Sequence, residues 1–248
     1  MMRFDILTLF PEMMEAVLGD SIIGRARKNG LVEVNFVQIR DFAINKHGQV
    51  DDYPYGGGFG MVMQAQPIFD AYESLCKDLD YKPYTIYLSP QGKTFRQSTA
   101  KKLSKMEHIV LLCGHYEGVD QRVLDEIVDA EISIGDYVLT GGEIACMAVV
   151  DAVSRLVPGV LKDEESFSDE SHFNGLLEYP QYTRPEIWHD KKVPDILLSG
   201  HHKNIAEWKR RMSIVNTFRK RRGMLGKAKL SEKEQKLVKE LKSGKVTE

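Results

Sequence analysis

The segment Ile132-Ser133-Ile134-Gly135-Asp136-Tyr137-Val138-Leu139-Thr140-Gly141-Gly142-Glu143 decides the fold of this chain. It joins a short apolar strand to a glycine-rich loop and then to the start of a long apolar helix. Two similar strand-to-loop junctions precede it, at Ile86–Gly92 and at Leu111–Gly118. Parallel strands bring such loops to the carboxyl edge of one sheet, where open α/β folds bind ligands. We therefore expect the three loops to converge on a small cofactor.

Strand-like and helix-like segments alternate before and around these loops. Apolar or alternating segments predict strands at Phe4–Leu9, Val32–Ile39, Tyr84–Leu88, His108–Cys113 and Glu131–Ile134. Apolar residues at helical spacing predict helices at Pro67–Leu79, Thr94–Ser104, Gln121–Ile127 and Gly142–Leu156. This alternation predicts an α/β fold in which helices cover both faces of a mostly parallel sheet.

The composition changes after Gly159. The segment 161–175 is rich in Asp, Glu and Ser, which is typical of a linker or lid. Farther on, Ile205, Trp208, Met212 and Val215 lie at helical spacing, and Ser231-Glu232-Lys233-Glu234 matches a capping box. We predict an α/β cofactor-binding domain over residues 1–160, a flexible linker over 161–175 and a small basic helical domain over 176–248.

The net charge of -2 hides an uneven distribution of charge. Residues 200–248 hold 15 Lys and Arg against 5 Asp and Glu, whereas the preceding residues hold 19 against 31. A basic appendage on an acidic body is typical of nucleic-acid binding. From composition alone, a solvated helical tail that keeps the protein soluble is an equal alternative.

Several classes of protein are disfavoured. No apolar run approaches the ~20 residues that span a bilayer, and the first residues read as a buried strand and not as a signal peptide. The three cysteines are far apart without a CxxC pair, so they predict neither disulfides nor zinc. The histidines show no metal-ligand spacing. We expect a reduced, cytoplasmic protein without a membrane segment.

Two functions other than binding a small cofactor in the three loops are open at this level. The turn Gly92-Lys93-Thr94 is half of a phosphate-binding P-loop, but Tyr87 stands where that motif needs its first glycine. A phosphotransferase that binds ATP at this turn is therefore disfavoured without being excluded. The second alternative is a non-catalytic RNA-binding protein that uses only the basic tail.

Arg155 is a candidate for chemistry near the end of the predicted helix Gly142–Leu156. It lies one turn after Asp151, so an ion pair within the helix is the simplest interpretation. A buried guanidinium also stays charged and offers forked donors to a developing anion. Among the linker carboxylates, a single one is enough to act as a base.

The sequences of these loops carry more information than their glycine content and position alone. Together with Tyr53–Met61, Gly175–Pro185 and Val193–Gly200, they closely resemble the bacterial tRNA (guanine-N1)-methyltransferase family, from the first strand to about Arg222. The resemblance implies a SPOUT-type methyltransferase with a trefoil knot near the carboxyl end of the sheet. It also implies a homodimer that methylates N1 of guanosine 37 in tRNA, using S-adenosylmethionine, when guanosine occupies position 36. Each active site would then draw on both subunits.

The resemblance also assigns the residues that contact S-adenosylmethionine. They lie in the three loops, where main-chain groups read the adenine edge and glycines let the backbone close around the cofactor. The implied residues are Tyr87, Leu88, Ser89, Pro90, Gly114, Tyr116, Glu117, Gly118, Ile134, Gly135, Asp136, Tyr137, Val138, Leu139, Gly141 and Gly142.

Catalytic roles follow from the same resemblance. Guanine N1 is a poor nucleophile until its proton leaves, which a carboxylate base and an arginine near O6 promote. Arg155 matches the family's arginine. The family's base is usually an aspartate five residues before Gly175, and here that position is Glu170, with Asp169 beside it as the substitute.

Contacts to the tRNA complete the implied site. Tyr182 and Arg184 are assigned to the bases of the anticodon loop, and Arg210 and Arg211 to phosphates. Magnesium is implied by the resemblance only, since no motif in the chain indicates it and no residue is assigned to a metal.

Overall fold

The computed structural model describes residues 1–162 and 170–244. The chain divides into two compact units, Met1–Lys162 and Asp163–Glu248. The boundary between the units falls inside the predicted linker 161–175, of which residues 163–169 lie outside the described residues. The limits of the three predicted parts stay predictions.

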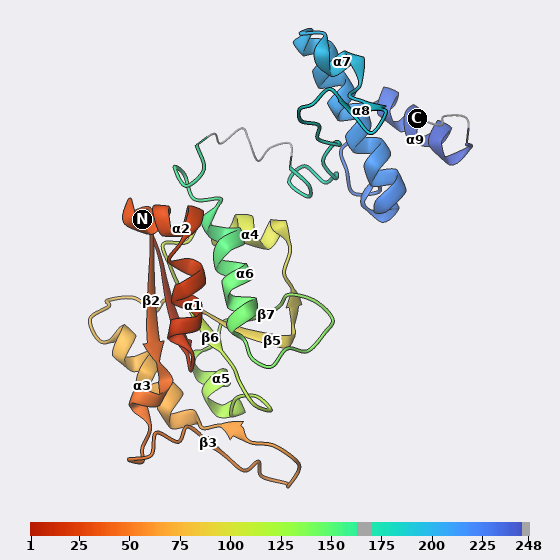
Figure 1. The fold of residues 1–248 in the computed structure, drawn as a ribbon. Coiled ribbons are helices and arrows are strands. Elements are labelled where there is room, and N and C mark those ends of the chain that lie inside the picture. The colour runs from red at the N-terminus through yellow and green to blue at the C-terminus, as the bar shows by residue number, and fades with distance from the viewer. Residues whose placement is uncertain (163–169, 245–248) are drawn as a thin grey trace. The chain divides into compact units, whose positions relative to one another are not determined.

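The first unit is built on one five-stranded sheet (Figure 1). In the order in which they lie side by side, the strands are β2 (Val32–Gln38), β1 (Met2–Thr8), β6 (His108–Cys113), β5 (Tyr84–Thr94) and β7 (Ala130–Ser133). Every pairing between them is parallel. The predicted α/β fold with a mostly parallel sheet is confirmed.

Helices cover both faces of this sheet. On one face lie α1 (Pro11–Leu18), α2 (Ser21–Lys28), α4 (Gln97–Leu103) and α6 (Glu143–Ser154), and on the other lie α3 (Ala65–Cys76) and α5 (Gln121–Ile127). Strand β6 shows why its sequence is apolar throughout. Ile109 and Leu111 join the core on the first face, whereas Val110 and Leu112 join the core on the second.

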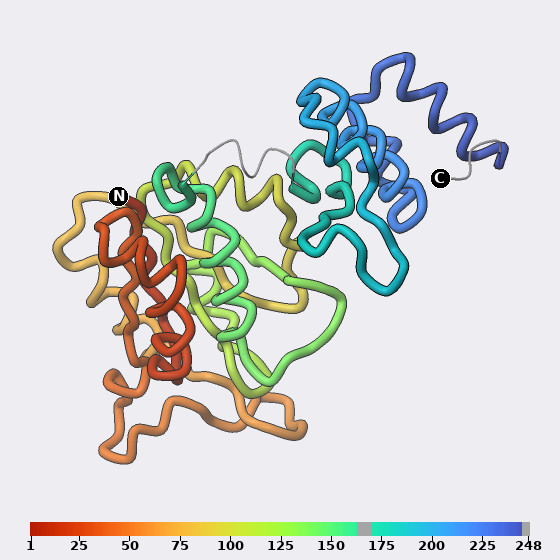
Figure 2. The backbone as a smooth tube through the Cα atoms, turned by 45° about the horizontal axis from the view of Figure 1, so that its top comes forward, coloured from red at the N-terminus to blue at the C-terminus, as the bar shows by residue number. Residues whose placement is uncertain are grey.

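Short elements fill the long stretch between β2 and α3. These are η1 (Ile39–Phe42), β3 (Asp51–Asp52) and β4 (Val62–Met63). Between β3 and β4 the chain forms a projecting glycine-rich loop, drawn in orange in Figure 2. Tyr55 and Phe59 in this loop are almost fully exposed.

Strand β5 is longer than the predicted Tyr84–Leu88. Leu88 and Lys93 both lie opposite Ile132 of β7, so residues 89–92 bulge out and the chain then returns to the sheet. Gly92 makes this return possible, because a Cβ at this position would lie 2.5 Å from the main-chain nitrogen of Ile132. The prediction that a helix begins at Thr94 is therefore wrong, and α4 begins at Gln97.

The second unit has its own small core. It contains a hairpin of β8 (Ile187–Trp188) and β9 (Lys191–Lys192), then α7 (Asp195–Leu198), α8 (His202–Lys220), η3 (Arg222–Met224) and α9 (Glu232–Lys242). Its buried residues are Leu176, Ile214, Val215, Phe218, Leu225 and Leu241. Of the predicted apolar stripe on α8 only Val215 is fully buried, because the helix turns Ile214 and Phe218 toward Leu176 and α9.

The predicted capping box at the start of α9 is present. The Ser231 hydroxyl accepts a hydrogen bond from the main-chain N–H of Glu234, and the Glu234 carboxylate accepts one from the N–H of Ser231. This reciprocal pair satisfies two donors at the helix start. The last helix is therefore a folded part of the second unit.

Candidate cofactor pocket and nucleic-acid interface

A cavity of about 280 Å³ opens at the carboxyl ends of β5, β6 and β7 in the first unit. Its volume is close to the lower end of small-molecule sites, roughly 300 Å³. The three loops predicted from the sequence line it, and every residue assigned to the cofactor contributes except Asp136. The structure therefore brings together residues that lie far apart in the sequence, at the sheet edge that was expected.

The second and third loops are fastened to each other through their backbones. The N–H of Gly142 donates to the carbonyl of Gly114 over 2.8 Å, and His115 forms a bridge with Gly141. A Cβ on Gly142 would lie 2.9 Å from the Cα of Cys113, so only glycine permits this approach. In this part of the pocket wall, the main chains of the two loops are in direct contact.

Polar groups within the loops hold the remaining turns. The Ser133 hydroxyl lies 2.9 Å from the carbonyl of Gly135, and the N–H of Phe95 donates to the carbonyl of Ser133. In the first loop, the Ser89 hydroxyl accepts from the N–H of Gln91. These turns are therefore held by hydrogen bonds within the protein.

Two buried side chains lie at or beside the pocket: Tyr87 lines it, and Cys113 precedes the pocket-lining Gly114. Burial, together with the nearby charge of Glu131, raises the pKa of Tyr87 to about 12, so its phenol stays neutral at physiological pH. Burial also raises the pKa of the Cys113 thiol well above its usual value, which disfavours a nucleophilic thiolate. Neither residue therefore brings an ionised group to this region at neutral pH.

Sequence reasoning missed His115, which also lines the pocket. Its Nδ1 is buried and has no hydrogen-bond partner within the described ranges, so its hydrogen-bonding capacity is unused within the protein. Its membership of the loop Gly114–Gly118 was the only signal in the sequence. The glycine-rich loop also reaches this region, since the N–H of Glu117 donates to the carbonyl of Met61.

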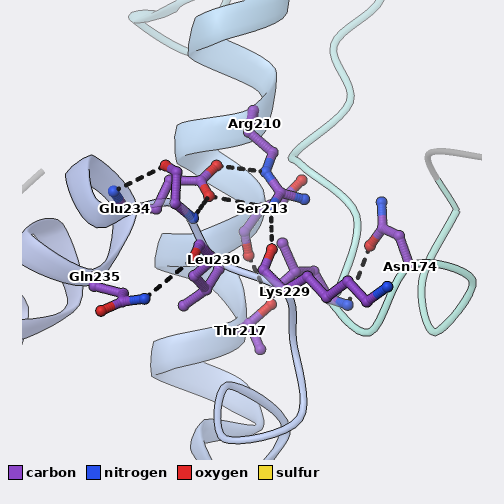
Figure 3. A network of polar contacts seen from close by, with 10 residues as sticks. Asn174, Arg210, Ser213, Thr217, Lys229, Leu230, Glu234 and Gln235 are labelled. Atoms are coloured by element: carbon purple, nitrogen blue, oxygen red, sulfur yellow. Dashed lines mark hydrogen bonds and ion pairs between the residues drawn. The ribbon is translucent and has the colours of Figure 1, made fainter.

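The residues assigned to tRNA lie in the second unit. Tyr182 is 48% exposed, with its ring centroid 6.3 Å from that of Trp208, and Arg184 and Arg211 are exposed. Arg210 differs from them. Its Nε lies 2.7 Å from a carboxylate oxygen of Glu234, and its guanidinium also donates to the carbonyl of Lys229 (Figure 3).

The contact with Arg210 has an electrostatic consequence for Glu234. The hydrogen bond from Arg210 is the largest cause that lowers the pKa of the Glu234 carboxyl, and burial opposes it. In Figure 3 the pair joins α8 to the start of α9. The structure therefore gives Arg210 a role in holding the last helix, which sequence reasoning did not foresee.

Comparisons with known proteins agree with this geometry. A family model described as tRNA (Guanine-1)-methyltransferase TrmD matches residues 2–227. The chain belongs to this family. It is 61% identical over 226 residues to a tRNA (guanine-N(1)-)-methyltransferase of Ruminiclostridium cellulolyticum, covering 91% of this chain and 97% of the relative. It is 56% identical to one of Clostridium perfringens, covering 96% and 99%.

A solved structure of the family shares the fold. The crystal structure of tRNA (m1G37) methyltransferase from Aquifex aeolicus matches with a TM-score of 0.74 and 44% sequence identity, covering 91% of this chain and 95% of that chain. The α/β architecture with a mostly parallel sheet is therefore common to both.

The structure does not bring Arg155 to the pocket of its own chain. Arg155 caps the C-terminal end of α6, whereas Gly142, at the other end, lines the pocket. The 12 residues of α6 separate the two ends by about 18 Å. The arginine that the family resemblance assigns to catalysis is half-buried at the far end of this helix.

Of the two candidate bases, only Glu170 lies within the described residues. Asp169 lies outside the described residues, as do Asp163, Glu164 and Glu165. Glu170 belongs to the second unit, where its carbonyl accepts from the N–H of Phe173 over 3.2 Å. His172 follows with a φ of 73°, in the left-handed region, and its N–H donates to the carbonyl of Leu176.

Two further properties concern metals and membranes. Within residues 1–162 and 170–244, no group of three His, Cys, Asp or Glu side chains is arranged to hold a metal ion. Among the same residues, no helix has the length and apolar character that crossing a bilayer requires.

Proposed function

We propose that this chain transfers a methyl group from S-adenosylmethionine to N1 of guanosine 37 in tRNAs that carry guanosine at position 36. The observation that supports it most is the pocket at the carboxyl ends of β5, β6 and β7. Fifteen of the sixteen residues that the family resemblance assigns to the cofactor line this pocket. Membership of the tRNA (guanine-1)-methyltransferase family supports the same reaction.

The pocket suits a nucleoside with a polar tail. Neutral Tyr87 and the side chains of Val138 and Leu139 offer apolar contact, while the loops offer main-chain donors and acceptors. The buried Nδ1 of His115 fits a ligand that brings polar groups. S-adenosylmethionine, when bound, supplies an electrophilic methyl group. The chain's own residues then have to position the guanine and remove its N1 proton.

The alternative of an ATP-dependent phosphotransferase loses its phosphate site. Lys93 and Thr94 pair with Ile132 and Ser133 inside the sheet, so Gly92-Lys93-Thr94 is part of a strand and not a loop that opens a helix. A P-loop needs free main-chain N–H groups in front of a helix. The turn that suggested ATP therefore cannot cradle a triphosphate.

A carboxylate and an arginine perform the proton chemistry in this proposal. Glu170, or Asp169 in its place, accepts the N1 proton, and the guanidinium of Arg155 stabilises the negative charge that develops toward O6. Arginine suits that role because it stays protonated and offers several donors. No step is assigned to magnesium, because the described residues offer no ligand cluster for it.

The position of Arg155 supports a homodimer. Arg155 follows the last residue of α6, a helix about 18 Å long, whereas Gly142 and Ala145 at the start of this helix line the pocket. We therefore assign Arg155 to a site that a second subunit completes. We propose that each active site combines the pocket of one subunit with Arg155 of the other. The trefoil knot belongs to the same proposal, supported by family membership.

Substrate recognition falls to the second unit in this proposal. Tyr182 and Arg184 contact the anticodon loop, and exposed Arg211 contacts phosphate. Arg210 contributes indirectly, because its ion pair with Glu234 fixes α9. Since the tRNA pool is cytoplasmic, we also propose a cytoplasmic location.

Radiolabelled methyl transfer tests the proposal. The full chain is assayed with tRNA transcripts that carry guanosine at both positions 36 and 37, adenosine at 36, or adenosine at 37. We expect 1-methylguanosine only in the first. Transfer that ignores position 36 would refute the specificity, and no transfer to any transcript would refute the function.

Two variants in the same assay identify the base. Glu170→Ala is expected to slow single-turnover transfer more than Asp169→Ala, and both are expected to leave S-adenosylmethionine binding unchanged. If Asp169→Ala is the slower, the base is Asp169. Wild-type rates in both variants would remove this segment from the mechanism.

A further inference from the structure

The hairpin of β8 and β9 carries an exposed tryptophan that no role assigned so far explains. Trp188 is 61% exposed and its neighbour Ile187 is 58% exposed. A large aromatic side chain at the tip of a small hairpin is unusual, because burying it would stabilise the fold. Here the tip leaves it exposed beside Ile187, so both side chains are available to a partner.

The turn that presents Trp188 is conformationally strained. Its two central residues, His189 and Asp190, have φ values of 47° and 62°, in the left-handed region that non-glycine residues seldom adopt. The pair of positive φ values is typical of a tight two-residue hairpin, which usually recruits Asn or Gly. Strain of this kind is often found where a side chain must be presented to a ligand.

The base of the hairpin is anchored, so its tip is presented by a fixed support. The Nζ of Lys192 lies 2.6 Å from the carboxylate of Asp195 on α7 and 3.6 Å from that of Glu186. The N–H of Val193 donates to the carbonyl of Glu186 over 2.9 Å. These contacts pin both strands next to α7.

The surroundings of Trp188 favour RNA over protein as the partner. The ring of His189 lies 4.3 Å from the indole, and Lys191 is the cross-strand neighbour of Trp188. Lys191 has no ion pair within the described ranges, whereas the charge of Lys192 is already matched. An aromatic ring beside a free cation suits an unpaired base and its phosphate. Two exposed apolar side chains are too little for a stable protein interface.

We propose that Trp188 stacks on an unpaired base of the tRNA while Lys191 contacts a neighbouring phosphate. This inference rests on the proposed function, since it takes the tRNA as the substrate. It adds a stacking contact to Tyr182 and Arg184 and assigns the hairpin of β8 and β9 to RNA binding. The cofactor pocket has no part in it.

Binding measurements with matched variants test the stacking contact. Trp188→Ala is expected to weaken tRNA binding about tenfold or more, within the range of one lost base–aromatic stack. Trp188→Phe should retain most of the affinity, because it keeps an aromatic face. Ile187→Ala, which removes a similarly exposed apolar side chain without a π-face, should change little. S-adenosylmethionine affinity, measured by calorimetry, should be equal in all three.

Salt dependence separates the two side chains. Trp188→Ala should lower the affinity at every salt concentration without altering the slope of log K against log salt. Lys191→Gln should reduce the magnitude of that slope by about one, because it removes one phosphate contact. An unchanged slope in Lys191→Gln would overturn the assignment of Lys191.

Fluorescence reports on the indole directly, because the chain contains only Trp188 and Trp208. In Trp208→Phe, where Trp188 is the single fluorophore, saturating tRNA is expected to quench the emission. The proposal would be overturned if tRNA left the emission unchanged and Trp188→Ala left the tRNA affinity unchanged. A loss of dimer mass in Trp188→Ala would also overturn it, because the hairpin would then be an interface between copies. Wild-type methyl transfer in parallel shows whether the proposed function itself holds.

Discussion

The pocket of the first unit and the basic surface of the second unit are built from different parts of the chain. The pocket wall consists largely of main chain, with glycines at contact distances and a neutral tyrosine at its base. The second unit offers exposed arginines, lysines and aromatic rings on the hairpin of β8 and β9, on α8 and on the segment before the hairpin. Small changes of backbone should therefore disable the pocket, while the RNA surface should lose affinity in graded, salt-dependent steps.

The largest effect is expected from Arg155→Ala, which lies outside the pocket and yet is assigned to the chemistry. Methyl transfer should fall by about 10²–10³-fold, the usual cost of one preorganised donor at a developing anion. S-adenosylmethionine binding should be unchanged, because α6 separates Arg155 from the pocket of its own chain. Single-turnover kinetics and calorimetry measure the two quantities.

The dimer can be tested with the same variant. Arg96→Ala, an exposed arginine of the first unit, is the matched control. Mixing Arg155→Ala subunits with subunits whose pocket is blocked should restore part of the activity if each site draws on both chains. Equal loss of cofactor binding and turnover in Arg155→Ala would mean that the arginine is structural.

The next effect concerns the backbone contact that closes the pocket. Gly142→Ala would place a Cβ 2.9 Å from the Cα of Cys113, so the loop must shift or the core must yield. We expect S-adenosylmethionine binding to weaken at least tenfold and the free energy of unfolding to fall by about 1–3 kcal/mol. Gly223→Ala in the second unit is the control, since its added Cβ meets nothing within 4 Å. Normal cofactor binding in Gly142→Ala would show that the close approach is not needed.

The sequence predicted this first unit well because its information is local. Strand β6 and helix α5 have the predicted bounds, since β6 is a continuous apolar run and α5 a short segment with apolar residues at helical spacing. Strand β5 was cut short because its return to the sheet depends on contact between Gly92 and residues of β7 about 40 positions later. Periodicity cannot reveal a contact of that range.

The functional residues also divide into those that local sequence could identify and those that depend on distant contacts. The three loops that line the pocket could be predicted because parallel strands force their following loops to one edge. The individual cofactor residues were assigned by the family resemblance. The partner of Arg210 was not readable, since Glu234 lies 24 residues away on another helix. The separation of Arg155 from the pocket was implied by the predicted helix length, at about 1.5 Å per residue. The proposed pairing of two subunits would give this arginine a use. The roles of these residues stay predictions.

A smaller effect, on stability, is expected from the ion pair of Arg210 and Glu234, which links α8 to α9. Glu234→Gln should lower the free energy of unfolding by roughly 0.5–1 kcal/mol at neutral pH, because the pair with Arg210 is partly exposed and screened. The pKa of Glu234 is lowered from 4.5, so its contribution is present above that pH. It should disappear as the pH falls through the lowered pKa, where the carboxyl takes up a proton.

Urea unfolding of wild type and Glu234→Gln between pH 3 and 7 measures this difference. Glu232→Gln, in the same first turn of α9, controls for the general effect of an acidic residue at a helix start. A difference between wild type and Glu234→Gln that stays constant down to pH 3 would contradict the role of the ionised pair.

The smallest effect should come from Arg211, and it distinguishes the two interpretations of the basic tail. If exposed Arg211 contacts a tRNA phosphate, Arg211→Gln weakens binding only a few-fold near physiological salt and reduces the salt slope by about one. Arg25→Gln, exposed on α2 of the first unit, should leave the slope unchanged. Arg210→Gln should mainly cost stability, because its guanidinium is engaged by Glu234. If Arg211→Gln leaves the slope of log K against log salt unchanged, Arg211 is only a solvent-exposed charge on α8. In that case, positive charge alone is not enough to assign an arginine of this helix to RNA binding.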